Sequence, residues 1–153
     1  MSLSGFTLPP MENEPVLGYL PGSPERKSLQ DELKRQSQEV VEIPCIINGE
    51  EVWTGNIVEQ VMPHKHAHVI ARVHLAGEME IRNAIEASLH AHQSWSSLQW
   101  QERAAVFIKA ADLLAGERRA EVNASTMLNQ SKTCHQAEID SACELIDFWR
   151  LNA

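Results

Sequence analysis

The spacing of apolar residues divides the chain into three parts. Residues 1–22 are rich in proline and glycine and show no regular apolar spacing, which predicts an extended N-terminal arm. From Glu42 to about residue 75, apolar residues fall in short runs that are typical of strands. Beyond Gly77 they recur at steps of three and four residues, as they do on the faces of amphipathic helices.

A helix is predicted to begin at Ser23 and to continue to about Glu39. Ser23 offers a capping hydroxyl, and Pro24 needs no amide partner in the first turn. Glu25 adds a negative charge at the positive end of the helix dipole. Two leucines form the whole apolar stripe of this segment, so we expect the helix to lie on the surface.

The strand region is organised around the pair Asn48-Gly49. Runs at 43–47 and 51–54 flank the pair, and both of its residues tolerate the positive φ that a tight hairpin turn needs. Two further strands are expected at 57–62 and 69–75, with a loop between them at 63–68. The sequence therefore predicts a β-hairpin within a meander, ahead of the helices.

The part after Gly77 carries four apolar stripes. Three of them are formed by Ile81, Ala84, Ile85 and Leu89, by Ala104, Phe107, Ile108, Ala111 and Leu114, and by Ala120, Ala124, Met127 and Leu128. The fourth, in residues 131–153, consists of Ile139, Ala142, Leu145, Ile146, Trp149 and Ala153. A β meander followed by about four helices lacks the repeated βαβ units of a complete doubly wound α/β domain. Such a segment can form the first part of one.

The last of these helices has a second face of unusual composition. Acidic residues, Glu144 among them, alternate there with Phe148 and Leu151. A helix side that faces water does not need a phenylalanine one turn from a glutamate. We therefore expect a helix covered on both sides, with Glu144 as a half-buried carboxylate able to hold a cationic group. The alternative is an ordinary solvated acid.

Composition excludes several classes of function. The chain has 153 residues, enough for one domain with a core, and a net charge of −8 with no cluster of basic residues, which argues against nucleic-acid binding. No apolar run approaches the roughly 18 residues of a membrane span. Three cysteines without CxxC spacing favour a reducing compartment over disulfides or a zinc knuckle. The first ten residues carry no basic residue and resemble no signal or transit peptide.

Two patterns could carry other chemistry. His64, His66 and His68 would share one face of a strand and could bind zinc, but Pro63 marks a turn and no carboxylate or cysteine lies nearby. An exposed loop is the simpler interpretation, so no metal site is assigned. Residues 129–133 resemble part of a phosphate-binding loop but lack its glycines. A helix connection with a Ser or Thr cap explains them better.

The cysteines offer a third pattern. Cys134-His135 suggests a thiol beside a base, but neighbouring residues on a helix diverge by about 100°. Cys143 borders the apolar stripe of the last helix and is explained as a small packed residue. No catalytic thiol is therefore assigned.

Short blocks spaced along the chain together resemble one enzyme family. The blocks are residues 13–17, 22–26, 50–54, 84–87, 109–114, 118–121, 132–133, 136–140 and 144–148. In order and spacing, from about Asn13 to Ala153, they are similar to the N-terminal part of the Δ1-pyrroline-5-carboxylate dehydrogenases, or glutamate-γ-semialdehyde dehydrogenases, of the aldehyde dehydrogenase superfamily. No single block is specific, but the set is.

The resemblance implies that residues 23–153 open the NAD-binding domain of such an enzyme and that residues 1–22 are an arm. The implied reaction oxidises glutamate-γ-semialdehyde to glutamate with NAD, in mitochondrial proline catabolism. In that family a cysteine thiolate attacks the aldehyde, an Asn and backbone amides stabilise the oxyanion, and a Glu activates water. None of those residues, nor the cofactor loop, matches a position in this chain, so no catalytic and no cofactor-binding residue is assigned.

One functional residue does carry over. Glu144 matches the helix acid that in the family lines the aldehyde channel and faces the amino group of the semialdehyde, which gives it an expected role in substrate binding. The chain departs from the family at Asn129 and Ser131, where the family has glycines, and at Trp149, where it has Phe. Loss of the glycines puts the connection before the last helix in doubt.

Two hypotheses about function follow. The first is the N-terminal segment of that dehydrogenase, catalytically incomplete alone, whose partners are the remainder of the fold or a homologous subunit of a homo-oligomer. The second is a non-enzymatic helical protein, derived from the enzyme, that pairs with another chain. The resemblance implies the mitochondrial matrix, while the start of the chain leaves the cytoplasm as an alternative.

Overall fold

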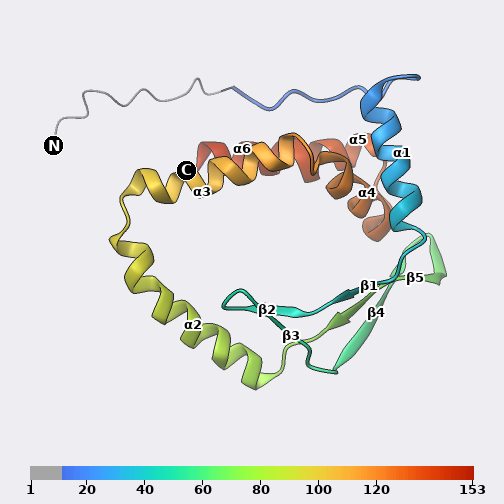
Figure 1. Ribbon diagram of the computed structural model, residues 1–153. Coiled ribbons are helices and arrows are strands. Elements are labelled where there is room, and N and C mark those ends of the chain that lie inside the picture. Colours follow the sequence, from blue (N-terminus) through green and yellow to red (C-terminus); the bar gives the residue numbers. More distant parts are fainter. Residues whose placement is uncertain (1–11) are drawn as a thin grey trace, which may run out of the picture.

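The computed structural model describes residues 12–153, and it combines helices and strands as expected (Figure 1). The arm predicted over residues 1–22 is thus described from Glu12 onward, and residues 1–11 lie outside the described part. Residues 12–20 contain no helix or strand, and a turn at Pro21-Gly22 leads into the first helix. The segment extends along the last helix of the chain (Figure 1).

The first helix, α1 (Pro24–Gln36), begins where the sequence predicts. The amide of Arg26 donates a hydrogen bond of 3.4 Å to the Ser23 hydroxyl, which caps the helix. Leu29 is buried and Leu33 packs against a core cluster, while most of the helix is exposed. The helix therefore lies on the surface, with its two leucines turned inward.

The strands form two separate sheets. Pro44 has no amide hydrogen and divides the first run into β1 (Val41–Ile43) and β2 (Cys45–Ile47). β2 pairs antiparallel with β3 (Glu50–Val52) across the Asn48-Gly49 turn, where φ is 54° and 80°. This hairpin confirms the prediction. β1 instead joins β5 (Lys65–His74) in parallel, and β4 (Ile57–Met62) joins the other edge of β5 antiparallel, which gives the order β1-β5-β4.

The loop predicted over residues 63–68 is wrong in length. Pro63 and His64 form a two-residue turn, and β5 already begins at Lys65, so His66 and His68 lie in a strand. The physical reason is an irregular register at Val61, which allows Met62 to pair with Lys65 and closes a tight connection.

The helical part begins with α2 (Glu78–Ser97), α3 (Trp100–Ala115) and α4 (Arg119–Gln130). The last predicted helix is continuous but irregular: α5 (Cys134–Ala137) passes into a π-helical segment, η1 (Glu138–Cys143), and then into α6 (Glu144–Leu151). The apolar spacing of this region predicts a helix but does not indicate the π-helical segment. α3 and α6 lie side by side, while α2 connects the strand region to α3 (Figure 1).

Two apolar clusters hold these elements together. Ala111 and Leu114 of α3 pack against Ala142 and Ile146, with Leu145 and Trp149 at the border. Met62 and Ile70 of the larger sheet pack against Leu128 of α4 and Leu33 of α1. The predicted inner face of the last helix is therefore confirmed at four positions, whereas Ala153 is exposed.

Candidate functional site

Glu144 lies at the start of α6 and is exposed, so it is not the half-buried carboxylate that the sequence suggested. Phe148 and Leu151, which follow it at four and seven residues, are 59% and 46% exposed. The reason is that the inner face of α6 packs on α3, and no other segment within residues 12–153 covers the face that carries Glu144. The mixed acidic and apolar face is therefore present, but it is exposed within residues 12–153.

The buried acid of this helix is Glu138, which is not among the site residues predicted from the sequence. Its side chain is fully buried at the start of η1. Five hydrogen bonds from nitrogen and oxygen donors reach its two oxygens: from the Leu17 amide (2.7 Å), the Tyr19 hydroxyl (2.7 Å), Asn123 Nδ2 (2.8 Å), and Arg119 Nη2 (2.5 Å) and Nε (3.3 Å). A buried carboxylate needs such a set of donors to remain charged.

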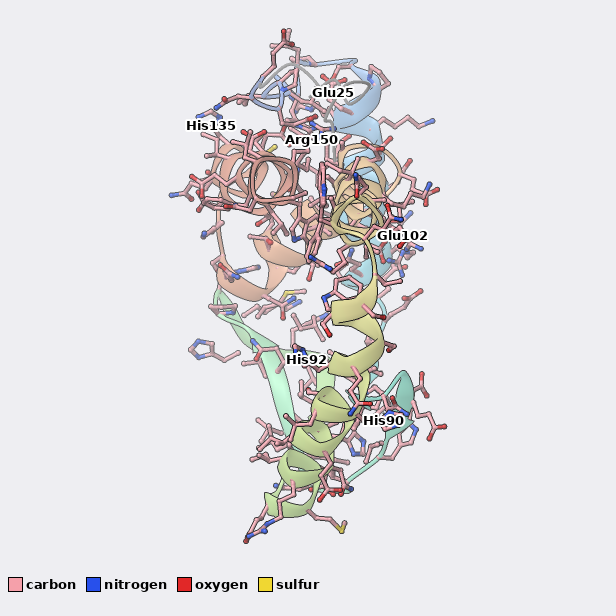
Figure 2. The ribbon with its side chains drawn as sticks, turned by 90° about the vertical axis from the view of Figure 1, so that its left-hand side faces the viewer. Glu25, His90, His92, Glu102, His135 and Arg150 are labelled. Atoms are coloured by element: carbon pink, nitrogen blue, oxygen red, sulfur yellow. The ribbon has the colours of Figure 1, made fainter. Side chains whose placement is uncertain are left out.

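Arg119 is the central cation of this network. It is 6% exposed, and besides Glu138 it donates to Glu14 Oε1 (2.5 Å) and to the Pro15 carbonyl oxygen (2.8 Å). The other oxygen of Glu14 accepts from Arg150 at 2.5 Å, and Figure 2 shows Arg150 beside the N-terminal segment. One network of charges therefore joins the arm, α4 and both ends of the last helix.

The electrostatics of Glu138 favour its charged form. Burial, the largest single influence, acts to raise the pKa of Glu138, but the hydrogen bonds from Arg119, Leu17 and Tyr19 together lower it below the ordinary value of 4.5. Burial and the neighbouring Glu138 carboxylate raise the pKa of Tyr19, so its hydroxyl remains a donor. Glu138 is therefore charged at neutral pH, and its ion pair with Arg119, together with the hydrogen bonds from Leu17, Tyr19 and Asn123, is here called the ionic lock.

The π-helical segment sets which side chains face this lock. Ala137 and Ala142 are both buried, as are Glu138 and Cys143, and each pair is five residues apart, the spacing of a π-turn. Cys143 Sγ lies 3.8 Å from Glu138 Oε1, so the wide turn brings the two onto one side. The sequence did hold a signal for Glu138, since Ala142 and Ile146 follow it at four-residue steps on the apolar side.

His64 and His68 each contact a residue elsewhere in the chain. His64 Nδ1 contacts Ser131 Oγ at 2.7 Å, and His68 Nε2 lies 2.8 Å from the Ser37 carbonyl oxygen. Within residues 12–153 no group of three or more His, Cys, Asp or Glu side chains could hold a metal ion. His90 and His92, two residues apart on α2, do not face each other either (Figure 2).

The other sequence candidates have structural explanations. The Thr133 hydroxyl accepts the Gln136 amide at 3.3 Å, and the Thr133 amide donates to Gln136 Oε1 at 2.9 Å. Residues 129–133 are therefore a helix connection with a capping box, as expected. Burial raises the pKa of Cys134, which argues against a reactive thiolate beside His135.

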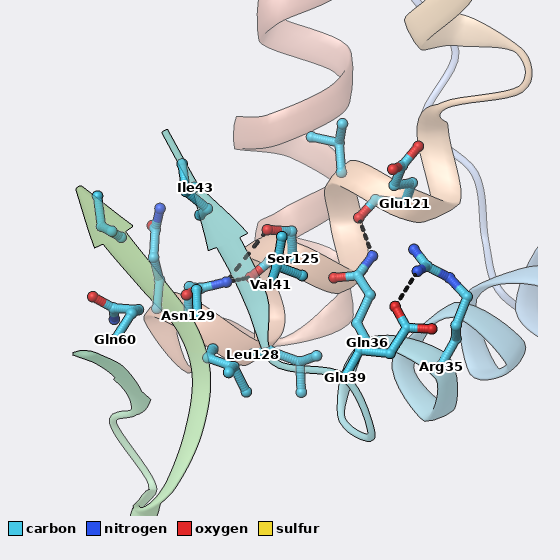
Figure 3. A pocket seen from close by; sticks show the side chains of 15 residues that line it. Arg35, Gln36, Glu39, Val41, Ile43, Gln60, Glu121, Ser125, Leu128 and Asn129 are labelled. Atoms are coloured by element: carbon cyan, nitrogen blue, oxygen red, sulfur yellow. Dashed lines mark hydrogen bonds and ion pairs between the residues drawn. The ribbon is translucent and has the colours of Figure 1, made fainter. Parts of the chain in front are cut away.

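A groove lies between the larger sheet and α4 (Figure 3). It encloses about 910 Å³ over an apolar floor that includes Val41, Ile43 and Leu128. Its rim is tied by the Gln36 side chain, which donates to the Glu121 carbonyl oxygen at 2.9 Å. No lining residue belongs to η1 or α6, so the groove is separate from Glu144.

Several large apolar side chains of α2 are exposed. α2 has no buried residue, and Ile81, Ile85 and Leu89 of its predicted stripe are 54%, 55% and 67% exposed. The helix is thus confirmed, but the described chain does not bury its stripe. In residues 12–153 no helix combines the length and apolar character needed to cross a membrane.

Comparison with known proteins identifies a family. The model of the aldehyde dehydrogenase family matches residues 52–153. The chain is 49% identical to a Δ1-pyrroline-5-carboxylate dehydrogenase of Agaricus bisporus over 97% of its length, and 50% identical to a mitochondrial Δ1-pyrroline-5-carboxylate dehydrogenase of Mus musculus over 92%. A crystal structure of the Mycobacterium tuberculosis Δ-pyrroline-5-carboxylate dehydrogenase, bound with NAD and cobalamin, matches with a TM-score of 0.94 and 42% identity.

These matches are nearly complete for this chain and partial for the others. The match covers 27% of the Agaricus protein and 25% of the mouse protein. It covers 99% of this chain but 29% of the Mycobacterium chain. The sequence thus spans about a quarter of the length of the relatives that it matches.

Proposed function

The chain belongs to the aldehyde dehydrogenase family, and from that premise we propose that it forms the N-terminal quarter of an NAD-dependent Δ1-pyrroline-5-carboxylate dehydrogenase. The complete enzyme would convert glutamate-γ-semialdehyde, NAD⁺ and water into glutamate, NADH and two protons. The observation that carries the proposal is the likeness of almost the whole chain, in sequence and in fold, to part of the Mycobacterium enzyme. On this proposal residues 1–153 have no turnover of their own.

The part of this chain in the reaction is substrate binding by Glu144. Its carboxylate is exposed, and within residues 12–153 it makes no hydrogen bond or ion pair. It is therefore available to pair with the ammonium group of the semialdehyde. Phe148, one turn further along the same face, would exclude water from that pair once the remainder of the fold covers the helix, and this would strengthen the attraction.

Residues 129–133 do not fit a turn that binds the phosphates of NAD. A dinucleotide phosphate needs free backbone amides on a glycine-bearing turn, whereas residues 129–133 hold no glycine and the Thr133 amide is already bonded to Gln136. We therefore assign the binding of NAD to the part of the enzyme beyond this chain. No step that involves the cofactor is assigned to residues 129–133.

The proposal extends to partners and location. The exposed apolar residues of α2 fit a surface that the remainder of the dehydrogenase, or a homologous subunit of a homo-oligomer, would cover. The proposed location is the mitochondrial matrix, and the mitochondrial names of the mouse and human relatives support a mitochondrial location. The same exposed surface supports the second candidate, a non-enzymatic protein that pairs with another chain.

A chimera tests the proposal. Residues 12–153 replace the matched segment of the mouse relative, and NADH formation from Δ1-pyrroline-5-carboxylate is measured by absorbance. We expect turnover from the chimera and none from residues 1–153 alone. A chimera that assembles and binds NAD but does not oxidise this substrate contradicts the proposal and favours the second candidate.

A further variant tests the role of Glu144. Glu144→Gln in the chimera should raise KM for glutamate-γ-semialdehyde about tenfold or more, because a charge-assisted hydrogen bond is lost, and should leave the KM for NAD unchanged. Glu39→Gln, the same chemical change at an exposed position of the described chain, is the control. An unchanged KM for the semialdehyde removes Glu144 from the site.

A further inference from the structure

Residues 14–19, here called the strap, lie along the last helix and bind it at both ends. Glu14 binds the C-terminal end, where its amide donates to Asp147 Oδ1 at 2.8 Å and its carboxylate accepts from Arg150 at 2.5 Å. Leu17 and Tyr19 bind the N-terminal end through Glu138. As the strap proceeds from residue 14 to 19, its contacts proceed from residue 150 to 138, so strap and helix run antiparallel.

The strap is also bound by α4. Arg119 of α4 is buried and ties both Glu14 and the Pro15 carbonyl oxygen to Glu138. Tyr19 has a φ of 49°, a left-handed conformation that is unusual for a bulky residue. Such a conformation persists where the surroundings over-determine it, and here the Tyr19 hydroxyl is held between Glu138 and Asn123.

The strap faces a stripe that runs from the end of η1 along α6 and adjoins the stripe of Glu144. Its contacts fall on Cys143, Asp147 and Arg150, at steps of four and three residues. Glu144 stands one residue beyond the first of these, about 100° further around the helix. Because the π-turn just before it breaks the regular backbone pattern, the direction of Glu144 depends on what holds the helix on each side of that turn.

We infer that the strap, with its anchors Glu138 and Arg119, positions Glu144 for the amino group of the substrate. The strap thereby sets the preference for an amino-bearing semialdehyde over the same aldehyde without the amino group. This inference rests on the proposed function. The strap side chains are positioning residues, because they act on the substrate through the helix and not by touching it.

The test compares two aldehydes in the chimera. Glutamate-γ-semialdehyde carries the amino group and glutarate semialdehyde lacks it, so the ratio of their kcat/KM values reports on the pairing with Glu144. We expect Tyr19→Phe and Glu14→Gln to lower this ratio about fivefold to tenfold, through KM for the amino-bearing substrate. Glutarate semialdehyde should be oxidised within about twofold of the parent rate, and Glu39→Gln should change neither value.

The outcomes separate this inference from the proposed function. If Glu144→Gln lowers the ratio but neither strap variant does, the positioning role is wrong and the function stands. Equal losses on both aldehydes in the strap variants also contradict it, since they indicate general damage. If Glu144→Gln leaves the ratio unchanged, the role proposed for Glu144 fails and the inference fails with it. Tyr19→Phe combined with Glu144→Gln should lower the ratio no further than Glu144→Gln alone.

Discussion

The substitution Glu138→Gln tests the buried ionic lock. The glutamine keeps the shape of the side chain and one acceptor oxygen, but its amide group faces hydrogen-bond donors on Tyr19, Asn123 and Arg119. The cationic Arg119 then remains buried with one carboxylate in place of two. Removing one partner of a buried ion pair costs about 3–5 kcal/mol, so we expect a loss of about 3 kcal/mol in the free energy of unfolding.

The assay is urea unfolding of the 153-residue chain, followed by circular dichroism at neutral pH. Glu144→Gln provides the matched control: it is the same change six residues away on an exposed position, expected to alter stability by less than about 0.5 kcal/mol. If Glu138→Gln unfolds within the same margin of the parent protein, the lock does not stabilise the fold.

The pH dependence of that difference provides a second check. The pKa of Glu138 is lower in the folded chain than its ordinary value of 4.5, so its charged form stabilises the fold above that pH. This contribution is lost as pH falls from 4.5 through the folded pKa. The stability difference between the parent protein and Glu138→Gln should therefore shrink in acid. A constant difference from neutral pH downward contradicts the assignment of a charged Glu138.

Two further predictions concern Ser131 and the cysteines. Ser131 has a φ of 54°, so the Ser131→Gly variant should be more stable than the Ser131→Ala variant by about 1 kcal/mol in urea unfolding. Both variants lack the hydroxyl that bonds to His64, and they differ only in the Cβ atom. Equal stabilities would contradict strain at this position. Burial raises the pKa of Cys143 to about 11, so a thiol reagent at neutral pH should modify Cys45 and Cys134 first and Cys143 only in denaturant. Mass spectrometry of the labelled peptides measures the order. Rapid labelling of Cys143 in the native protein would contradict its burial.

The elements that the sequence predicted well are those with local causes. The Asn48-Gly49 pair determines a hairpin by its own backbone preferences, and Ser23 with Pro24 determines a helix start in the same way. The inner face of the last helix follows from the spacing of Ala142 and Ile146. Each of these signals lies within a few residues and depends little on the remainder of the fold.

The features that escaped prediction have long-range causes. Glu138 is charged and buried because Leu17 and Tyr19, more than a hundred residues earlier, supply donors to it. No periodicity in the sequence contains that pairing, and the π-turn that accompanies it has no recognised residue pattern. Glu144 was predicted to be half-buried because Phe148 lies on the same face, but it is exposed. An apolar neighbour in the sequence does not say which chain, if any, packs against that face.

The initial rate of NADH formation by the chimera, measured with Δ1-pyrroline-5-carboxylate beside the parent mouse enzyme, tests the central claim most directly. If residues 12–153 form the N-terminal quarter of such a dehydrogenase, the chimera should retain a rate within about tenfold of the parent enzyme, because half of the matched residues are identical and cores tolerate substitutions that conserve volume. A chimera that folds and binds NAD, yet gives no NADH above the level without substrate, contradicts the claim.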